Sequence, residues 1–439
     1  MSAADTIYAL ATGSGTAAIA VIRLSGPRAV QVIEAMSRKS LPPRQAVRVR
    51  LSGLDGLALD DALAVSFPEG ASFTGEAVGE LHVHGGRAVV SAVLSDLAAR
   101  GLRHAEPGEF TRRAFGNGKL DLVEIEGLAD LLAARTEGQR RHALRQLEGE
   151  ASAVFEGWRF RLVRLLAHAE AVIDFADEAH VAEAVLEPMF AETMALISEI
   201  EGLLSAPSGR ERMREGFRLV LAGSPNVGKS SVFNCLVDRD AAMVSALPGT
   251  TRDVIEAFLD FGGLPVLLAD TAGLRTSSPD PLELEGMRRS QERLENADLV
   301  LWLAAADSEF LSPSLDSEPL WIWNKADLLP PPADGRNWLA ISAKTGDGFV
   351  ALEAAVRQRL EAQLDCGGDD VLITRDRHRQ ALAAAAQHLK DSLSDAGRRA
   401  PELFAEELRQ AAGALGRLTG RVDVEDLLDV IFRDFCIGK

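Results

Sequence analysis

The chain has few cysteines and no long apolar run. Its three cysteines, Cys235, Cys366 and Cys436, cannot all pair with one another, so they predict reduced thiols and a cytoplasmic protein. No apolar stretch of about 18 residues is free of charge, so no membrane-spanning helix and no membrane partner are expected. The first basic residue is Arg23, so the start of the chain lacks the charged region of a secretory signal.

Basic residues are also scarce. The chain has 47 Lys and Arg against 65 Asp and Glu, a formal net charge of −18. A protein that follows nucleic-acid phosphates over a long track needs a basic footprint. The excess of acid therefore argues against that class, although it leaves room for a local basic patch. Otherwise the chain is 47% hydrophobic and 26% charged, which is typical of globular domains with a core.

Three sequence patterns follow one another along the chain and predict a multidomain fold of α+β and α/β type. Residues 1–118 mix β-branched runs with glycine, typical of short strands and turns. Residues 119–213 carry apolar residues at helical spacing. Residues 214–366 alternate apolar strands with helix-like stretches, as in an α/β domain with a mainly parallel sheet. The helical pattern returns over 367–439, so we predict that the α/β domain is inserted into an all-α domain.

Several elements can be placed by residue number. In the first domain we expect strands in IAVIRLSG (19–26) and GEAVGELHVHGG (75–86), and a helix over 87–101. In the α/β domain the expected strands are FRLVLAG (217–223), VLLAD (266–270), LVLWLA (299–304) and PLWIWNK (319–325). The pair Gly262-Gly263 separates VIEAFLDF from LPVLLAD and predicts a hairpin, so one strand should be antiparallel.

A phosphate-binding loop is the strongest motif. The stretch GSPNVGKS (223–230) fits G-x-x-x-x-G-K-[ST] and lies between a predicted strand and a predicted helix, the context that gives this motif meaning. Its glycines let backbone N–H groups turn toward phosphate oxygens, and the helix N-terminus adds positive potential. Lys229 is expected to reach the β- and γ-phosphates, and the Ser230 hydroxyl to bind Mg²⁺.

Further motifs at strand ends select the base. Asp327 of Asn324-Lys325-Ala326-Asp327 can accept from N1–H and the exocyclic amine of guanine, a donor pair that adenine lacks. Ser342-Ala343-Lys344 follows the next strand and can close over the base. Asp270-Thr271-Ala272-Gly273 supplies a carboxylate behind Mg²⁺ and a glycine that faces the γ-phosphate. Together, in this order, the motifs resemble the P-loop GTPases and predict a Ras-like domain with GTP as substrate.

The usual catalytic glutamine is replaced. Leu274 stands where Ras-like GTPases carry a glutamine that orients water, and no arginine finger is evident. The side-chain oxygen of Asn226 and the oxygens of residues 245–251 could instead coordinate a monovalent cation beside the phosphates, where it would stabilise developing charge. Thr251 would also bind Mg²⁺. The alternative for Asn226 is turn formation alone.

Other stretches carry a resemblance to one family. These are LPGTTRD (247–253), DTAGLR (270–275), the terminal CIGK, IAVIRLSGP (19–27), SFTGE (72–76), HVHGG (82–86) and GEFTRRAF…NGKLDL (108–122). Over nearly its whole length the chain resembles the MnmE (TrmE) family of tRNA modification GTPases, one of the TrmE-Era-EngA-like P-loop GTPases. The resemblance implies an N-terminal folate-binding and dimerisation domain, a helical domain and an inserted G domain.

The resemblance also implies an activity and its partners. GTP hydrolysis would be stimulated by K⁺ and activated by dimerisation of the G domains within a homodimer. With the FAD-containing partner MnmG (GidA), the protein would add a carboxymethylaminomethyl- or aminomethyl-type group to the wobble uridine of tRNA. A tetrahydrofolate derivative, 5-formyl- or methylene-tetrahydrofolate, would supply the one-carbon unit. The tRNA would be contacted mainly within the complex.

Site residues carry over from the family by position. The K⁺ ligands would be Asn226, Ser245, the Leu247 carbonyl and Thr250, and the Mg²⁺ ligands Ser230 and Thr251. Glu283 would activate hydrolysis through water, alongside Lys229 and Thr251. Folate would contact Arg23, Glu80, Lys119 and Lys439. The residues expected to contact GTP are Asn226, Val227, Gly228, Lys229, Ser230, Ser231, Ser245, Ala246, Leu247, Pro248, Gly249, Thr250, Thr251, Asp270, Thr271, Ala272, Gly273, Asn324, Lys325, Ala326, Asp327, Ser342, Ala343 and Lys344.

Some interpretations stay open. The CIGK tail fits a lipidation signal poorly, because Gly438 is not aliphatic and Lys439 is not a usual last residue; the resemblance makes it a buried functional terminus. Cys436 is either a small buried thiol or a nucleophile that adds to a uracil ring. His82 and His84 share a strand face but have no evident third metal ligand. A GTP-dependent switch in ribosome assembly is the alternative function, and a dimer with a vestigial G domain is a third.

Overall fold

The structure is a computed structural model of the 439-residue chain. It describes residues 5–13, 15–174, 179–205, 209–239, 256–270, 291–308, 318–365, 373, 375–422 and 438. The chain divides into two compact units. The first comprises residues 1–129, 152–160 and 412–439, and the second comprises residues 130–151 and 161–411.

The first unit is built on a six-stranded sheet of order β3-β4-β5-β2-β1-β6. Its strands are β1 (Ile7–Leu10), β2 (Ile19–Ser25), β3 (Val47–Ser52), β4 (Ala58–Phe67), β5 (Val78–His84) and β6 (Arg103–His104). Neighbouring strands are antiparallel except β1 and β6, which are parallel. Strand β3 shows why the sheet forms: Val49 and Leu51 are buried while Arg48 and Arg50 are exposed, the alternation of a sheet with one face on a core.

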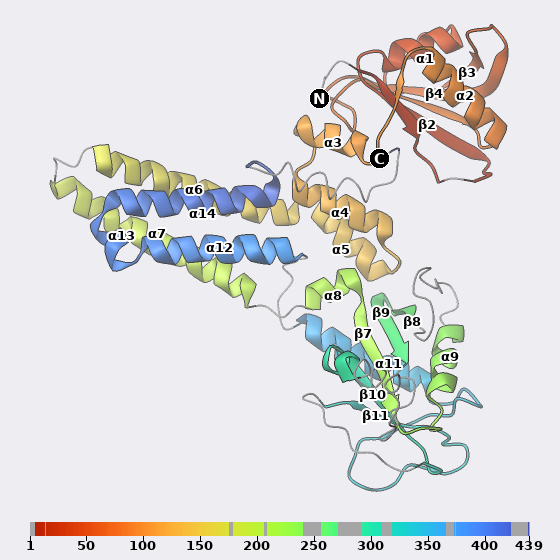
Figure 1. Cartoon of the computed structure of the whole chain (residues 1–439), viewed down its shortest axis with the longest axis vertical. Helices are drawn as coiled ribbons and strands as arrows, with labels where there is room; N and C mark the ends of the chain where they lie inside the picture. The colour runs from red at the N-terminus through yellow and green to blue at the C-terminus, as the bar shows by residue number, and fades with distance from the viewer. Residues whose placement is uncertain are drawn as a thin grey trace, which may run out of the picture. The chain divides into compact units, whose positions relative to one another are not determined.

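Three helices complete this domain. Helices α1 (Ala29–Ser37) and α2 (Arg87–Ala99) share one core with the same face of the sheet (Figure 1). Phe110 of α3 (Glu109–Gly116) packs in a second cluster with Ile7 and Ala9. The strands expected in 19–26 and 75–86 and the helix expected over 87–101 are confirmed.

The reading of 1–118 as mainly strands and turns missed α1 and α3. Both begin without a side-chain cap, at Arg28 and at Gly108. Both are also short, with 9 and 8 residues, so their apolar residues show little helical repeat, whereas the 13-residue α2, which also lacks a side-chain cap, was predicted.

The second unit contains a six-stranded sheet of order β12-β11-β10-β7-β9-β8. Its strands are β7 (Phe217–Gly223), β8 (Glu256–Phe261), β9 (Leu264–Asp270), β10 (Leu299–Ala304), β11 (Leu320–Trp323) and β12 (Leu339–Ala340). All pairs are parallel except β8 with β9. Every residue of β10 is buried, as expected for a parallel sheet covered on both faces. The predicted Gly262-Gly263 hairpin and its single antiparallel strand are confirmed.

Two helices pack on this sheet. Helices α9 (Lys229–Arg239) and α11 (Phe349–Asp365) share the main core of the sheet. Further helices in the two units are α4 (Leu122–Ala133), α5 (Glu137–Leu147), α6 (Glu150–Asp174), α7 (Ala179–Leu204), α8 (Gly209–Glu215), α12 (Asp376–Ser392), α13 (Asp395–Arg399) and α14 (Pro401–Thr419). No helix in the described ranges is both long and apolar enough to cross a membrane.

Helical segments from before and after the α/β domain pack together. Helices α7 and α12 lie side by side (Figure 1), and Arg379 Nη1 donates to the carbonyl oxygen of Leu204 at 2.9 Å. The rings of Phe190 in α7 and Phe404 in α14 meet edge to face, with centroids 5.3 Å apart. The predicted insertion of the α/β domain into a helical domain is confirmed.

Candidate nucleotide site

The loop between β7 and α9 is shaped by residues with positive φ. Gly223, Asn226 and Gly228 have φ of +139°, +64° and +94°. A Cβ on Gly223 would lie 2.2 Å from the Leu303 carbonyl oxygen, and one on Gly228 would lie 2.4 Å from Asn324 Nδ2. Both glycines of the motif are therefore required by close approach of the neighbouring strand ends as well as by conformation.

Lys229 begins α9 and is folded into this loop. Its ammonium donates to the carbonyl oxygens of Gly223 and Ser224, both at 2.9 Å, and the residue is only 7% exposed. Val232 N–H bonds to Gly228 O, so the helix continues directly from the loop. The helix has 11 residues, and the N–H groups at a helix N-terminus point out of the helix end. A cation and a helix N-terminus at one loop make a site for a phosphate group.

Asn324 joins the phosphate loop to the loop after β12. It is 2% exposed, its Nδ2 donates to Val227 O at 2.8 Å, and its Oδ1 accepts from Ala343 N–H at 3.2 Å. Lys325 Nζ adds a bond of 3.1 Å to Asn226 O and pairs with Asp307 Oδ2 at 2.5 Å. That bond from Lys325 lowers the pKa of the exposed Asp307.

Asp327 is held by a hydroxyl. Ser342 Oγ donates to Asp327 Oδ1 at 2.7 Å, which orients the carboxylate. A cavity of about 240 Å³ lies here. Its walls are Gly228, Ser231, Asn324, Lys325, Asp327, Leu328, Ser342, Ala343 and Lys344. Base-contact residues predicted from two separate motifs therefore meet beside the phosphate loop.

Ser230 and Asp270 are residues of the types that bind Mg²⁺. Ser230 follows Lys229 at the start of α9, and Asp270 ends β9, where it pairs with Leu221 on the neighbouring strand β7. Hydroxyl and carboxylate oxygens are the ligands that this hard cation prefers.

Within the described part of the chain, no three His, Cys, Asp or Glu side chains gather as a metal site. His82 contacts Glu80 at 3.3 Å and His84 contacts Asp60 at 2.8 Å, so the two histidines do not act as a pair.

Several predicted site residues lie outside the described residues. They are Ser245, Ala246, Leu247, Pro248, Gly249, Thr250, Thr251, Thr271, Ala272, Gly273, Glu283, Cys436 and Lys439. Of the predicted K⁺ ligands, Asn226 alone is described, and its positive φ suits a loop position next to phosphate oxygens.

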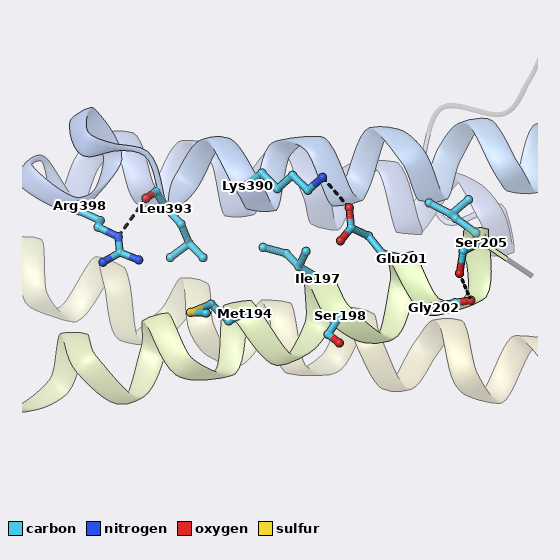
Figure 2. A pocket seen from close by; sticks show the side chains of 10 residues that line it. Met194, Ile197, Ser198, Glu201, Gly202, Ser205, Lys390, Leu393 and Arg398 are labelled. Atoms are coloured by element: carbon cyan, nitrogen blue, oxygen red, sulfur yellow. Dashed lines mark hydrogen bonds and ion pairs between the residues drawn. The ribbon is translucent and has the colours of Figure 1, made fainter.

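A larger cavity, of about 950 Å³, lies between α7 and the α12–α13 region (Figure 2). Met194, Ile197 and Leu393 line it with apolar side chains. Its charged residues bond locally: Lys390 Nζ pairs with Glu201 Oε1 at 2.5 Å, and Arg398 Nε donates to Leu393 O at 2.9 Å. We place the candidate site at the phosphate loop because several polar groups converge there, and a large volume alone does not indicate a reactive site.

A second cluster forms in the first unit around the loop 70–76. Arg23 and Glu80 are opposite each other in the β2–β5 register, with Nε and Oε1 3.0 Å apart. The Arg23 guanidinium lies 5.7 Å from the ring centre of Phe73, and Lys119 Nζ donates to Gly70 O at 2.5 Å. Three of the four predicted folate contacts therefore border one loop, which also offers the partly exposed Phe73 ring. Carboxylate, cations and aromatic ring fit a flat heterocycle with donor groups.

Gly438 lies against the first strand of the same unit. It is buried, has φ +103°, and a Cβ there would lie 2.2 Å from Leu10 O and 3.0 Å from Ala11 Cα. Leu10 pairs with Ile22, the neighbour of Arg23. The sequence singled out the CIGK tail, but only the fold shows what Gly438 contacts.

An ion-pair network that sequence reasoning missed supports the loop. Arg113 Nη2 pairs with Asp5 at 2.6 Å, and Arg113 Nη1 lies 3.1 Å from Glu76 Oε2. Arg103 Nη2 pairs with the buried Glu109 at 2.5 Å. Burial raises the pKa of Glu109, but bonds from Arg103, from the Glu106 N–H and from Arg113 outweigh it and hold that pKa below its ordinary value. The motifs 72–76 and 108–115 contain Glu76, Glu109 and Arg113, whereas Asp5 and Arg103 lie outside both.

Two family models match the chain. One, described as "MnmE helical domain", matches residues 122–436, and the other, "GTP-binding protein TrmE N-terminus", matches residues 6–119. Relatives named tRNA modification GTPase MnmE include one from Paramagnetospirillum magneticum, 50% identical over 99% of this chain and 100% of the relative. Another, from Parvibaculum lavamentivorans, is 51% identical over 99% and 100%.

Solved structures match part of the chain. The G domain of the T. maritima FeoB iron transporter is 22% identical and aligns with 34% of this chain and 99% of that chain, with a TM-score of 0.26.

Proposed function

This chain belongs to the MnmE (TrmE) family of tRNA modification GTPases, and from that premise we propose how it uses GTP. It is a GTP hydrolase that acts in tRNA modification. In our proposal K⁺ stimulates hydrolysis and dimerisation of the G domains activates it. The reaction drives, together with the FAD-containing partner MnmG, addition of a carboxymethylaminomethyl- or aminomethyl-type group to the wobble uridine of tRNA.

One observation carries the nucleotide part of the proposal. Asn324 hydrogen-bonds both to Val227 in the phosphate loop and to Ala343 in the loop after β12. A ligand with a guanine and a phosphate chain would therefore meet both groups of residues in a prearranged geometry. We propose that GTP contacts residues within 226–231, 245–251, 270–273, 324–327 and 342–344.

The residues divide the hydrolysis among them. Lys229 would exchange its two carbonyl partners for the β- and γ-phosphates, where it offsets developing negative charge. Ser230 and Thr251 would hold Mg²⁺, with Asp270 behind, and Asp327 would accept from guanine. Mg²⁺ when bound neutralises charge on the phosphates.

A monovalent cation would take the place of an arginine finger. Asn226, Ser245, the Leu247 carbonyl and Thr250 would hold K⁺, which supplies positive charge beside the transferred phosphoryl group. Glu283 would help to activate hydrolysis through water. The neutral Leu274 at the usual glutamine position favours this arrangement.

The first unit would bind the one-carbon donor. Arg23, Glu80, Lys119 and Lys439 would contact a tetrahydrofolate derivative, in the 5-formyl or methylene form. The support is the Arg23–Glu80 pair beside Phe73 and the contact of Gly438 with Leu10.

Domain roles and partners follow the family. We propose an N-terminal folate-binding and dimerisation domain over 1–118, a helical domain over 119–213 and 367–439, and a G domain over 214–366. The protein would act in the cytoplasm as a homodimer, bind MnmG, and contact tRNA mainly within that complex.

The test compares GTP hydrolysis in KCl and in NaCl at equal ionic strength, for the wild type and for Asn226→Ala. We expect a large K⁺-specific stimulation that Asn226→Ala loses, because a cation ligand is removed. Equal rates in the two salts would refute the cation mechanism and turn attention to an external activating protein, as a ribosome-assembly switch would use.

A further inference from the structure

Three of the five tryptophans of the chain lie together beside the candidate base site. Trp338 meets Trp321 and Trp323 edge to face, with ring centroids 5.6 Å and 5.5 Å apart and interplanar angles of 65° and 70°. Trp321 and Trp323 belong to β11, whereas Trp338 ends the loop that returns from Asp327 to β12. The cluster therefore links β11, which precedes the loop with Asp327, to β12, which precedes the loop with Ser342.

Trp323 hydrogen-bonds to the segment that carries Asp327 and to the segment that leads to Ser342. Its indole Nε1 donates to Leu329 O at 2.9 Å, which closes the segment that carries Asp327. Its carbonyl oxygen accepts from Ile341 N–H at 2.8 Å, and Ile341 O accepts from Ala326 N–H at 3.0 Å. Ile341 precedes Ser342. Trp323 is therefore bonded to the segments that carry the two partners of the Ser342–Asp327 hydrogen bond.

Trp338 covers Trp323 on the outside and is itself held. Its Nε1 donates to Asp334 Oδ1 at 2.9 Å. The Arg336 guanidinium lies over the rings of Trp321, at 5.1 Å, and Trp338, at 5.9 Å, and Arg336 also pairs with Asp334. Trp323 is buried while Trp338 is partly exposed. A surface loop is thus folded back as a lid on the tryptophan next to Asn324.

We propose that Trp338 is a positioning residue for guanine recognition. By packing on Trp323 it keeps the Leu329 carbonyl and β12 in place, and so keeps Ser342 Oγ at 2.7 Å from Asp327. Binding to a preformed carboxylate avoids the cost of ordering the loop when nucleotide arrives. This inference rests on the proposed contact between Asp327 and the base. It predicts an effect on base binding and none on phosphate chemistry.

The experiment uses the full chain and a fluorescent N-methylanthraniloyl-GDP, displaced by GDP or by inosine diphosphate. Inosine lacks the exocyclic amine, so inosine diphosphate makes one bond fewer to Asp327. We expect Trp338→Ala to weaken GDP about tenfold and inosine diphosphate by less than about threefold, a loss of the size of one hydrogen bond to a charged group. Turnover at saturating GTP should stay within about twofold, because Lys229 is untouched.

Two further variants allow for a folding defect in Trp338→Ala. Trp338→Phe keeps the ring contact and should rescue GDP affinity to within about threefold of wild type. Asp334→Ala lies on the exposed loop, removes the acceptor of the Trp338 indole, and should reproduce the selective loss of GDP affinity more weakly. Equal weakening of both nucleotides by Trp338→Ala, or no weakening of either, would overturn the proposal.

Controls separate this role from general stability and from the base assignment. Val356→Ala removes a buried core side chain of α11 and should lower the melting temperature without changing the GDP preference; if it changes that preference equally, the proposal fails. Asp327→Asn should lose GDP and gain xanthosine diphosphate, whose 2-oxo group accepts from an amide. If that switch occurs while Trp338→Ala is neutral, only the role of Trp338 is wrong; if it does not occur, both assignments are wrong.

Discussion

The side-chain amide of Asn324 donates a 2.8 Å hydrogen bond to the carbonyl oxygen of Val227, 97 residues earlier in the chain. The same side chain accepts from the Ala343 N–H. One buried residue thus holds the loop for phosphate and the loop for the base in a single geometry. Neither loop has regular structure of its own, so this link defines their separation.

We expect Asn324→Ala to lower the free energy of unfolding by about 1–3 kcal/mol, because it leaves the buried Val227 carbonyl and the partly buried Ala343 N–H without their partner. Nucleotide affinity should fall with it. Urea unfolding and GDP titration would measure the two effects. Asn296→Ala is the control, since Asn296 is exposed and bonds only to Glu292 O of its own helix among the described contacts. If Asn296→Ala lowered the free energy of unfolding and the GDP affinity as much as Asn324→Ala, the bridging role of Asn324 would be contradicted.

Gly438→Ala should displace the end of the chain from β1. The new Cβ would lie 2.2 Å from Leu10 O at a φ of +103°, and strain of this kind costs about 1–3 kcal/mol. We expect faster hydrogen exchange at Leu10 and Ala11 and at least about tenfold weaker binding of 5-formyltetrahydrofolate. Gly413→Ala in α14 is the control, because a Cβ there meets nothing within 4 Å. Unchanged exchange would show that Gly438 does not dock there.

Acid should destabilise the first unit through Glu109. Its folded-state pKa lies below the ordinary value of 4.5, so the stability it confers is present above about pH 4.5 and is lost as the pH falls through the lower folded value. Glu109→Gln should therefore reduce the decline of stability between neutral and acid pH, as followed by urea midpoints. Glu137 is the comparison: its pKa falls to about 2, but it is exposed, so Glu137→Gln should change the pH profile little. A wild-type profile in Glu109→Gln would contradict this account.

Gly138→Ala should strain the contact between α5 and the β8–β9 turn. Gly138 N–H donates to Gly263 O at 3.1 Å, and a Cβ on Gly138 would lie 2.4 Å from that oxygen. We expect a loss of about 1–3 kcal/mol from overpacking and faster hydrogen exchange at 262–264. Gly157→Ala in α6 has open space and should be neutral or stabilising. If both variants keep wild-type exchange at the turn, this contact does not hold the hairpin.

Local patterns were enough for much of the fold and for the nucleotide motifs. The strands 217–223 and 299–304 were placed because a parallel sheet buries nearly every residue of its strands, which leaves continuous apolar runs in the sequence. Gly262-Gly263 marked a hairpin because few other residues adopt its positive φ. Helices α1 and α3 were missed because they have only 9 and 8 residues, too few for a clear helical repeat of apolar residues.

What the sequence determined by itself is the chemistry at strand ends: the phosphate loop, Asn324 to Asp327, Ser342 to Lys344, and the order that places them at one edge of a parallel sheet. Each depends on residue types a few positions apart, which local geometry constrains. Only the tertiary structure decided that Asn324 bonds to Val227, that Trp338 covers Trp323 and that Gly438 lies on Leu10. These contacts join segments whose separation along the chain imposes no distance in space, so packing of the whole domain has to bring them together.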